Sequence, residues 1–152
     1  MANWCTNYIY LYGTRRDEVR NLFQTLEGAE QGETFDFIKD VERYFFNVDV
    51  DESSIRFETK WSPPIMEMTK VCNNYGITCE IYYEEWGVRL YGYCRIQEGK
   101  VVKINLTEED LKGLTYDDDG EAYWHGEPLE SEWELLDDLL AEKIQHHYDN
   151  AL

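Results

Sequence analysis

Alternating hydrophobic and polar residues mark the start of the chain as a strand, because successive strand side chains point to opposite faces. Residues 5–12 follow this pattern, with a cysteine and two aliphatic residues on one side and three tyrosines on the other. Apolar side chains then recur at helical spacing over residues 14–27, where Thr14 and Asp17 have the spacing of an N-terminal capping box. The same helical spacing over residues 35–46 predicts a second, short helix.

Turn-forming residues divide the next apolar segments into two hairpins with a helix between them. Residues 46–51 and 55–61 are predicted strands on either side of an Asp-Glu-Ser-Ser turn. A Ser-Pro-Pro sequence then begins a helix over residues 63–75, because proline is tolerated in the first helical turn. Residues 77–84 and 87–97 supply the second pair of strands.

The order of these elements predicts the fold class. Strand, helix, strand, strand, helix and strand, with one added antiparallel strand, is the order of a ferredoxin-like split βαβ sandwich. We therefore expect an α+β protein with a four- or five-stranded antiparallel sheet and helices on one face only.

Charge divides the chain into two parts. Residues 1–106 hold 17 acidic and 12 basic residues, whereas residues 107–152 hold 15 acidic residues and only 2 lysines. This shift predicts a ferredoxin-like core over residues 1–106 and an acidic extension over residues 107–152. Residues 114–116 and 122–124 have the pattern of a small hairpin, and a capping-box signal at Ser131 begins a terminal helix. We expect the extension to be folded and packed on the core.

Composition limits the classes of partner. The chain is 43% hydrophobic and 15% aromatic, which is typical of a folded protein, and its net charge is -18. Such a charge argues against duplex nucleic acid and anionic membranes as ligands and favours a basic partner. We find neither a membrane span nor a signal peptide, so we expect a cytoplasmic protein. The four cysteines contain no Cys-x-x-Cys pair and are interpreted as reduced core residues.

Four local patterns carry a resemblance to a known family. They are Asn3-Trp4-Cys5-Thr6-Asn7, Thr59-Lys60-Trp61-Ser62-Pro63-Pro64, Tyr83-Glu84-Glu85 with Gly87, and Gly92. Together they resemble the YubB ferredoxin-like domain family of phage and plasmid proteins over residues 1–100. A Trp-Gly-Thr-Lys-Trp segment frequent in that family has no counterpart between residues 28 and 54, and the acidic extension lies outside the resemblance. The resemblance implies a ferredoxin-like fold, a mobile-element setting and a bacterial host, and it carries over no catalytic residues.

Two acidic patterns suggest metal sites. Magnesium-dependent nucleases hold the metal with an Asp and a Glu-x-Lys on paired strands, and this chain has Asp49 or Asp51 followed by Glu58-Thr59-Lys60. Alternation alone, however, places Glu58 and Lys60 on the solvent face of a strand. Asp117-Asp118-Asp119-Gly120 suggests a calcium loop, but the first and twelfth loop positions would be threonine and glycine, so a hairpin turn is preferred. We expect no metal, no cofactor and no enzymatic activity.

The outer face of the sheet is a second candidate surface. Alternation places there a set of tyrosine and basic side chains: Tyr8, Tyr10, Tyr12, Arg56, Lys60, Tyr82, Arg89, Tyr91, Tyr93 and Arg95. Three explanations compete for this aromatic and basic face: the extension covers it, a single-stranded nucleic acid stacks on it, or a protein partner or second copy in a homodimer covers it.

The leading hypothesis concerns the acidic extension. Its candidate binding residues are Asp117, Asp118, Asp119, Glu130, Glu134, Asp137, Asp138 and Glu142. A rigid array of carboxylates can compete for a cleft that binds phosphates, so we expect a non-enzymatic phage or plasmid protein that inhibits a basic host defence or nucleic-acid-binding protein. The alternatives are a single-strand binder acting through the sheet face, the metal-dependent nuclease, and acidity that serves only solubility.

Overall fold

The computed structural model describes residues 3–29, 32–38, 44–85, 87 and 89–150 of the 152-residue chain. The chain forms two compact units, residues 1–103 and residues 104–152. No helix in the described part of the chain is both long enough and apolar enough to cross a membrane.

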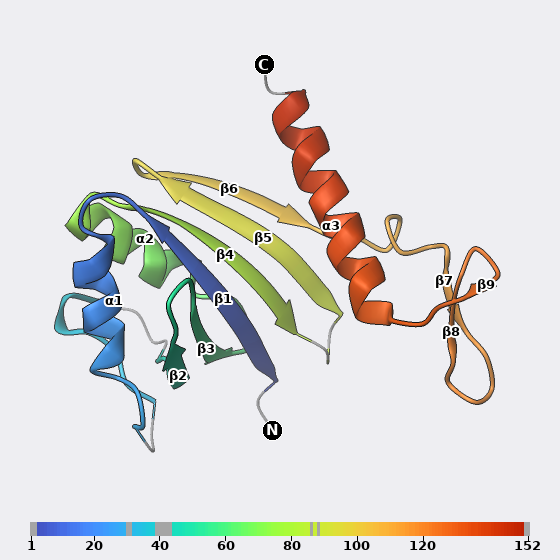
Figure 1. The fold of residues 1–152 in the computed structure, drawn as a ribbon, viewed down its shortest axis with the longest axis horizontal. Coiled ribbons are helices and arrows are strands. Elements are labelled where there is room, and N and C mark those ends of the chain that lie inside the picture. The colour runs from blue at the N-terminus through green and yellow to red at the C-terminus, as the bar shows by residue number, and fades with distance from the viewer. Residues whose placement is uncertain (1–2, 30–31, 39–43, 86, 88, 151–152) are drawn as a thin grey trace. The chain divides into compact units, whose positions relative to one another are not determined.

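A six-stranded sheet with the order β2-β3-β1-β4-β5-β6 is the centre of the fold (Figure 1). The strands are β1 (Trp4–Tyr12), β2 (Phe46–Val50), β3 (Ile55–Lys60), β4 (Thr78–Glu85), β5 (Leu90–Gln97) and β6 (Lys100–Asn105). β1 pairs antiparallel with both β3 and β4, so the first strand lies in the middle of the sheet. The order β2-β3-β1-β4 is that of a ferredoxin-like sheet and confirms the predicted fold class.

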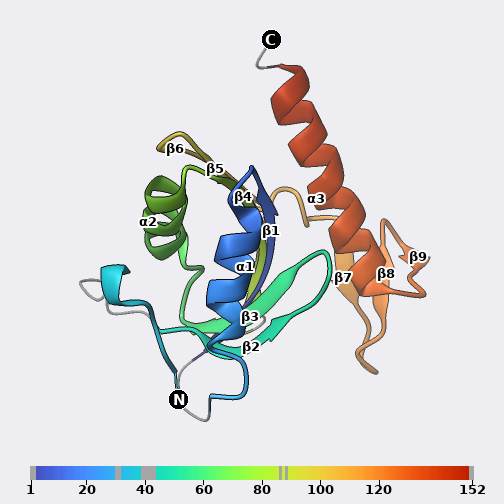
Figure 2. The same ribbon diagram turned by 60° about the vertical axis from the view of Figure 1, so that its left-hand side comes forward.

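Both helices of this unit cover the same face of the sheet, as predicted (Figures 1 and 2). They are α1 (Arg16–Gln24) and α2 (Ile65–Tyr75). Their buried side chains pack with the inward side chains of the strands in one apolar core. Phe23 of α1 stacks on Phe57 of β3, with ring centroids 5.5 Å apart, and Phe45 lies 4.7 Å from Phe57. These large aromatic contacts fix α1 against the sheet.

Three local expectations were wrong. The expected capping box at Thr14 does not form, because α1 begins after Arg15 and has no side-chain cap. The helix expected over residues 35–46 is limited to a 3-10 turn, η1 (Asp36–Ile38), since Phe45 forms a bridge with Glu33 and the chain then enters β2; residues 39–43 lie outside the described residues. The sheet also has a strand, β6, that was not expected.

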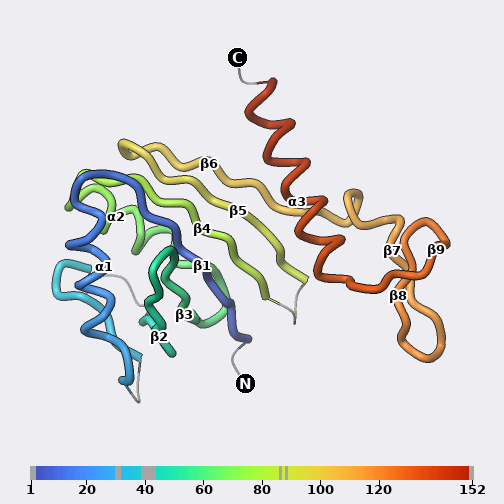
Figure 3. Tube along the Cα trace, viewed as in Figure 1, coloured from blue at the N-terminus to red at the C-terminus, as the bar shows by residue number. Residues whose placement is uncertain are grey.

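The second unit contains a small antiparallel sheet and the longest helix (Figure 3). Its elements are β7 (Leu114–Tyr116), β8 (Ala122–Trp124), β9 (Glu127–Pro128) and α3 (Glu132–Asp149). The hydroxyl oxygen of Ser131 accepts a hydrogen bond from the backbone N–H of Glu134 at 3.3 Å, which is the predicted cap of α3. The predicted hairpin and terminal helix are both confirmed.

Candidate functional site

Both lysines of the second unit pair with acids of the same unit. The Lys143 ammonium donates to Asp110 at 2.5 Å and to the backbone oxygen of Asn105 at 2.6 Å, and this tie joins α3 to the segment that precedes β7. The bond from Lys143 lowers the pKa of the Asp110 carboxyl. Lys112 pairs with Glu109 at 2.6 Å. Neither lysine pairs with any of the eight candidate acids.

All eight candidate binding acids of this unit are exposed: Asp117, Asp118, Asp119, Glu130, Glu134, Asp137, Asp138 and Glu142. Glu130 was expected on the terminal helix, but it precedes the Ser131 cap and so lies outside α3. On α3, Leu136 and Leu140 form the buried side. At about 100° per residue, Glu134, Asp138 and Glu142 lie one turn apart on the opposite side. Asp137 lies on the flank of this stripe, where burial, with a smaller contribution from Asp138, raises the pKa of its carboxyl.

At the hairpin tip, Asp117 has a structural role that Asp118 and Asp119 do not share. Asp117 accepts hydrogen bonds from the backbone N–H groups of Asp119 and Glu121 at 3.0 and 2.9 Å and from the Tyr123 hydroxyl at 3.0 Å. The backbone bond from Glu121 makes the largest contribution to a lowered pKa of Asp117. Asp117 therefore shapes the turn, and Asp118 is better placed to meet a partner.

The outer sheet face differs in charge from the expectation. The register places Tyr8 beside Arg56 and Tyr82, and Tyr82 beside Tyr93, so the predicted tyrosines do share this face. The predicted bases on the face are Arg56, Lys60 and Arg95, while Arg89 lies in the turn before β5. The same parity also places three glutamates there, Glu58, Glu80 and Glu84. The face is thus aromatic and close to charge balance, and the expectation of a basic surface was wrong because the glutamates were not counted.

One of these glutamates organises the tyrosines around it. The Tyr12 hydroxyl donates to Glu80 at 2.6 Å, and the Tyr93 hydroxyl donates to the other oxygen of the same carboxylate. The bond to Glu80 is the main reason that the pKa of Tyr12 rises to about 12. Tyr91 and Tyr93 are only 7% and 1% exposed, so neither offers a ring face on which a base could stack.

The residues proposed for a magnesium-dependent nuclease are not arranged as a set of metal ligands. Asp51 accepts bonds from the backbone N–H groups of Ser53 and Ser54 at 2.9 and 2.8 Å, which makes it the residue that shapes the β2–β3 turn. Asp49 is exposed and lies opposite Arg56, and Glu58 lies 3.9 Å from the Arg56 guanidinium. Within the described residues, no group of three histidines, cysteines, aspartates or glutamates is arranged to hold a metal ion.

Neither the cysteines nor the Asp117–Gly120 segment has the features of a reactive or metal-binding site. Cys5, Cys72, Cys79 and Cys94 are all buried and none forms a disulfide, and burial raises the pKa of Cys94 to about 11. A protonated thiol is a poor nucleophile and a poor metal ligand. Gly120 has φ of 84° and closes a tight turn at the hairpin tip. The Asp-rich segment is therefore the hairpin turn that the sequence analysis preferred over a calcium loop.

All four of the sequence patterns that resemble a known family meet at one end of the sheet. The register places Trp4 opposite Lys60, and Tyr83 opposite both Asn7 and Gly92. The Asn7 amide is fully buried and donates to the Thr59 hydroxyl at 3.1 Å. That hydroxyl donates in turn to the backbone oxygen of Ser62 at 2.7 Å, and so a polar chain crosses from β1 to the turn that begins α2.

Three buried carboxylates were missed from the sequence: Glu67, Glu84 and Glu85. Glu67 of α2 and Glu85 of β4 are each only 2% exposed. Glu85 accepts a hydrogen bond from the backbone N–H of Gly87 at 2.8 Å. A signal existed for Glu85, because it continues the inward parity of Cys79 and Ile81 along β4. A buried carboxylate is costly unless it is hydrogen-bonded, and the backbone N–H of Gly87 supplies such a bond to Glu85.

Comparison with known proteins gives a match to a family model. A family model described as a ferredoxin-like domain in Api92-like proteins matches residues 40–126, which is more than half of the chain. The match begins after β1 and α1 and extends through the β7–β8 hairpin, part of the extension that was expected to lie outside the resemblance. Neither the curated proteins nor the solved structures that were compared gave a match.

Proposed function

This chain belongs to the family of ferredoxin-like domains in Api92-like proteins, and from that premise we propose that it is a non-enzymatic binding protein whose acidic C-terminal unit docks on a basic protein surface. The carboxylates take the place that nucleic-acid phosphates would occupy on the partner. The partner class is a bacterial nucleic-acid-binding or defence protein, which the chain inhibits in the cytoplasm. A phage or plasmid origin follows from the resemblance of the Asn3–Asn7 and Trp61–Pro64 segments to the YubB family.

One observation carries this proposal: within the residues that the structure describes, no lysine or arginine pairs with the acid stripe of Glu134, Asp138 and Glu142 on α3. Residues 107–152 contain only two lysines, and both pair with acids outside the stripe, Glu109 and Asp110. Glu134, Asp138 and Glu142 are like charges one helical turn apart, an arrangement that costs a few tenths of a kcal/mol per pair. A partner with complementary charge would recover this cost on binding.

The sheet face is the weaker of the two candidate surfaces. A single-strand binder needs exposed aromatic rings beside cations, because the phosphates must be neutralised. Here Glu58, Glu80 and Glu84 share the face with its cations, and the hydroxyls of Tyr12 and Tyr93 are bound to Glu80. These acids would repel the phosphates of a strand that stacked on the tyrosines.

The test is capture of a partner followed by charge reversal. The tagged chain is used to capture proteins from a bacterial lysate at about 50 mM and then at about 500 mM salt, since charge contacts weaken as the screening length falls. The captured protein is then purified and its association rate is measured with Asp118→Lys/Asp137→Lys/Asp138→Lys. We expect a slower association rate by about tenfold or more and a smaller dependence on salt.

A matched variant separates the surface from the total charge. Glu27→Lys/Glu33→Lys/Asp36→Lys reverses three exposed acids of the first unit and gives the same net charge. It should associate at the rate of the parent chain. If both triple variants slow association equally, only the total charge matters and the docking surface is wrong. If neither does, the acidity serves solubility.

A further inference from the structure

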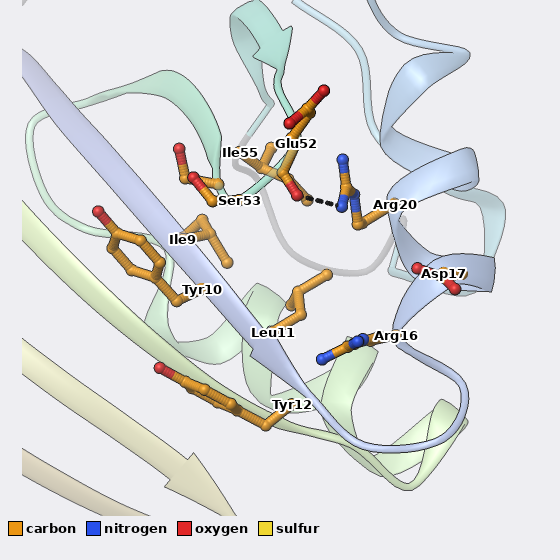
Figure 4. Close-up of a pocket in the computed structure, with 11 residues that line it drawn as sticks. Ile9, Tyr10, Leu11, Tyr12, Arg16, Asp17, Arg20, Glu52, Ser53 and Ile55 are labelled. Carbon is orange, nitrogen blue, oxygen red and sulfur yellow. Dashed lines mark hydrogen bonds between the residues drawn. The ribbon is translucent and has the colours of Figure 1, made fainter.

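The first unit contains a pocket of about 280 Å³ between β1, α1 and the turn that joins β2 to β3 (Figure 4). Its apolar wall consists of Ile9, Leu11 and Ile55, which also contribute to the core. Pockets for drug-sized ligands usually measure about 300 to 1,000 Å³. This one therefore suits a small group or the end of a chain better than a large cofactor.

The strand that borders the pocket has an open edge. Pairing of β1 with β3 ends where Ile9 lies opposite Ile55, whereas its pairing with β4 continues to Tyr12 opposite Thr78. Among the strands that the structure describes, the Tyr10–Tyr12 segment thus has a neighbour on one side only. An open edge presents unpaired backbone N–H and C=O groups, which an extended peptide can use to add a strand. Three residues of strand give an edge about 10 Å long.

Two arginines of α1 lie beside this edge, and they differ in what they bind. The Arg20 guanidinium donates to the backbone oxygen of Glu52 at 2.5 Å and to that of Asp51, and so it ties α1 to the β2–β3 turn. For the Arg16 side chain, the described residues supply no hydrogen-bond or salt-bridge partner. Figure 4 shows Arg16 extending from α1 toward Leu11, while the Glu52 carboxylate points away from it.

The charges around the pocket indicate how a ligand would be selected. Asp17 and Glu52 line the pocket together with the two arginines, so its overall charge is balanced. A balanced pocket attracts no anion by its field alone, and selection must come from one directed contact. A guanidinium is suited to such a contact, since it binds a carboxylate through two parallel hydrogen bonds.

We propose that this pocket binds the C-terminal end of an extended polypeptide, whose backbone adds to the edge of β1 at Tyr10–Tyr12 and whose terminal carboxylate pairs with Arg16. The last side chain of the polypeptide would lie against Leu11 and Ile55, which favours a small aliphatic residue. This inference is independent of the proposed function of the acidic unit, since every residue involved lies in the first unit.

The test uses two short peptides and the full chain labelled with ¹⁵N. The probes are acetyl-Thr-Val-Thr-Val with a free carboxylate and the same peptide as a C-terminal amide. We expect the free acid to shift the backbone amide resonances of Tyr10–Tyr12 and the side-chain Nε–H of Arg16. The amide should bind about tenfold more weakly, because it lacks the charge-assisted pair.

Variants and a small anion complete the test. Arg16→Gln should lower the affinity for the free acid to that for the amide. Arg15→Gln is the matched control and should leave the affinity unchanged, because Arg15 pairs with Glu18 at 2.7 Å and lies over the Tyr75 ring. Equal binding of acid and amide would overturn the proposal, as would the absence of shifts along β1 at about 5 mM peptide. The proposal would also be overturned if acetate shifts the Arg16 resonance while the peptide leaves the resonances of β1 unchanged. The pocket would then bind a small anion only.

Discussion

Removal of the Asn7 amide tests the account of the polar joint at the end of the sheet, which is the chain of hydrogen bonds from Asn7 through Thr59 to Ser62. The two N–H groups of this fully buried amide serve the backbone oxygens of Cys5 and Phe57 and the hydroxyl of Thr59, at 3.1 to 3.3 Å. Two net hydrogen bonds contribute about 2 kcal/mol, and truncation leaves a small cavity worth about 1 kcal/mol more. Asn7→Ala should therefore lower the free energy of unfolding by about 3 kcal/mol.

The assay is urea unfolding followed by near-ultraviolet circular dichroism, with thermal unfolding as a second readout. A loss of about 3 kcal/mol corresponds to a fall in melting temperature of about 6 to 12 °C for a chain of this length. Thr6→Ala is the matched control, because Thr6 is the preceding residue of β1 and lies half-buried on the opposite face. It should change the free energy of unfolding by no more than about 0.5 kcal/mol.

An isosteric variant separates the hydrogen bonds from the volume. Asn7→Asp keeps the size of the side chain but replaces the donor with a carboxylate that faces two backbone oxygens. A buried charge that faces backbone oxygens and receives only a weak bond from the Cys5 thiol is costly, so this variant should be less stable than Asn7→Ala. If Asn7→Asp is as stable as the parent chain, or Asn7→Ala loses less than about 0.5 kcal/mol, the reasoning about the joint is refuted.

Two further predictions concern ionisable groups on the two units. The Tyr12 phenol should ionise at about pH 12 in ¹³C-tyrosine spectra and return toward its ordinary pKa of 10.0 in Glu80→Gln. Because the folded pKa is raised, the stability due to this bond is complete below pH 10 and is lost as the pH rises toward 12; ionisation of Tyr12 near pH 10 in the parent chain would contradict the bond. Asp138→Lys converts two like-charge pairs with Glu134 and Glu142 into attractive pairs, so it should stabilise α3 by about 1 kcal/mol at low salt while weakening partner binding. A melting temperature that falls at low salt would show that the stripe carries no repulsion.

The elements of the fold could be predicted where the pattern of apolar residues was long or where a turn was distinct. The βαββαβ order came from alternation and helical spacing, and the β7–β8 hairpin was predicted at its observed bounds. β6 was missed because Glu98 and Gly99 form a two-residue turn with φ of 51° and 76°. Both residues are left-handed, as a tight hairpin turn requires, but glutamate at the first position is an uncommon signal.

The helix expected over residues 35–46 failed for a different reason. Phe35, Ile38 and Phe45 do enter the core, so the apolar positions were correctly identified. A short turn followed by a strand can also bury apolar residues that are separated by three or four positions. Tertiary pairing of Phe45 with Glu33 decides between the two, and local spacing contains no information about such a pairing.

For the candidate sites too, features set by one local element could be predicted from the sequence, whereas contacts between distant residues could not. Exposure of the acids on α3 follows from the position of Leu136 and Leu140 within a single helix, so it could be predicted. The bond between Tyr12 and Glu80 joins residues far apart in the chain and depends on strand register. Only the structure could identify it.

Competition between this chain and nucleic acid for the captured partner tests the central proposal most directly. The chain is bound to its purified partner at low salt, and a single-stranded or duplex oligonucleotide that the partner binds is added at increasing concentration. If the carboxylates of the acidic unit occupy the phosphate-binding surface, the oligonucleotide should displace the parent chain, and the Asp118→Lys/Asp137→Lys/Asp138→Lys variant should be displaced at a lower concentration. Simultaneous binding of the chain and the oligonucleotide to the partner would contradict the proposal that the acidic unit mimics phosphate.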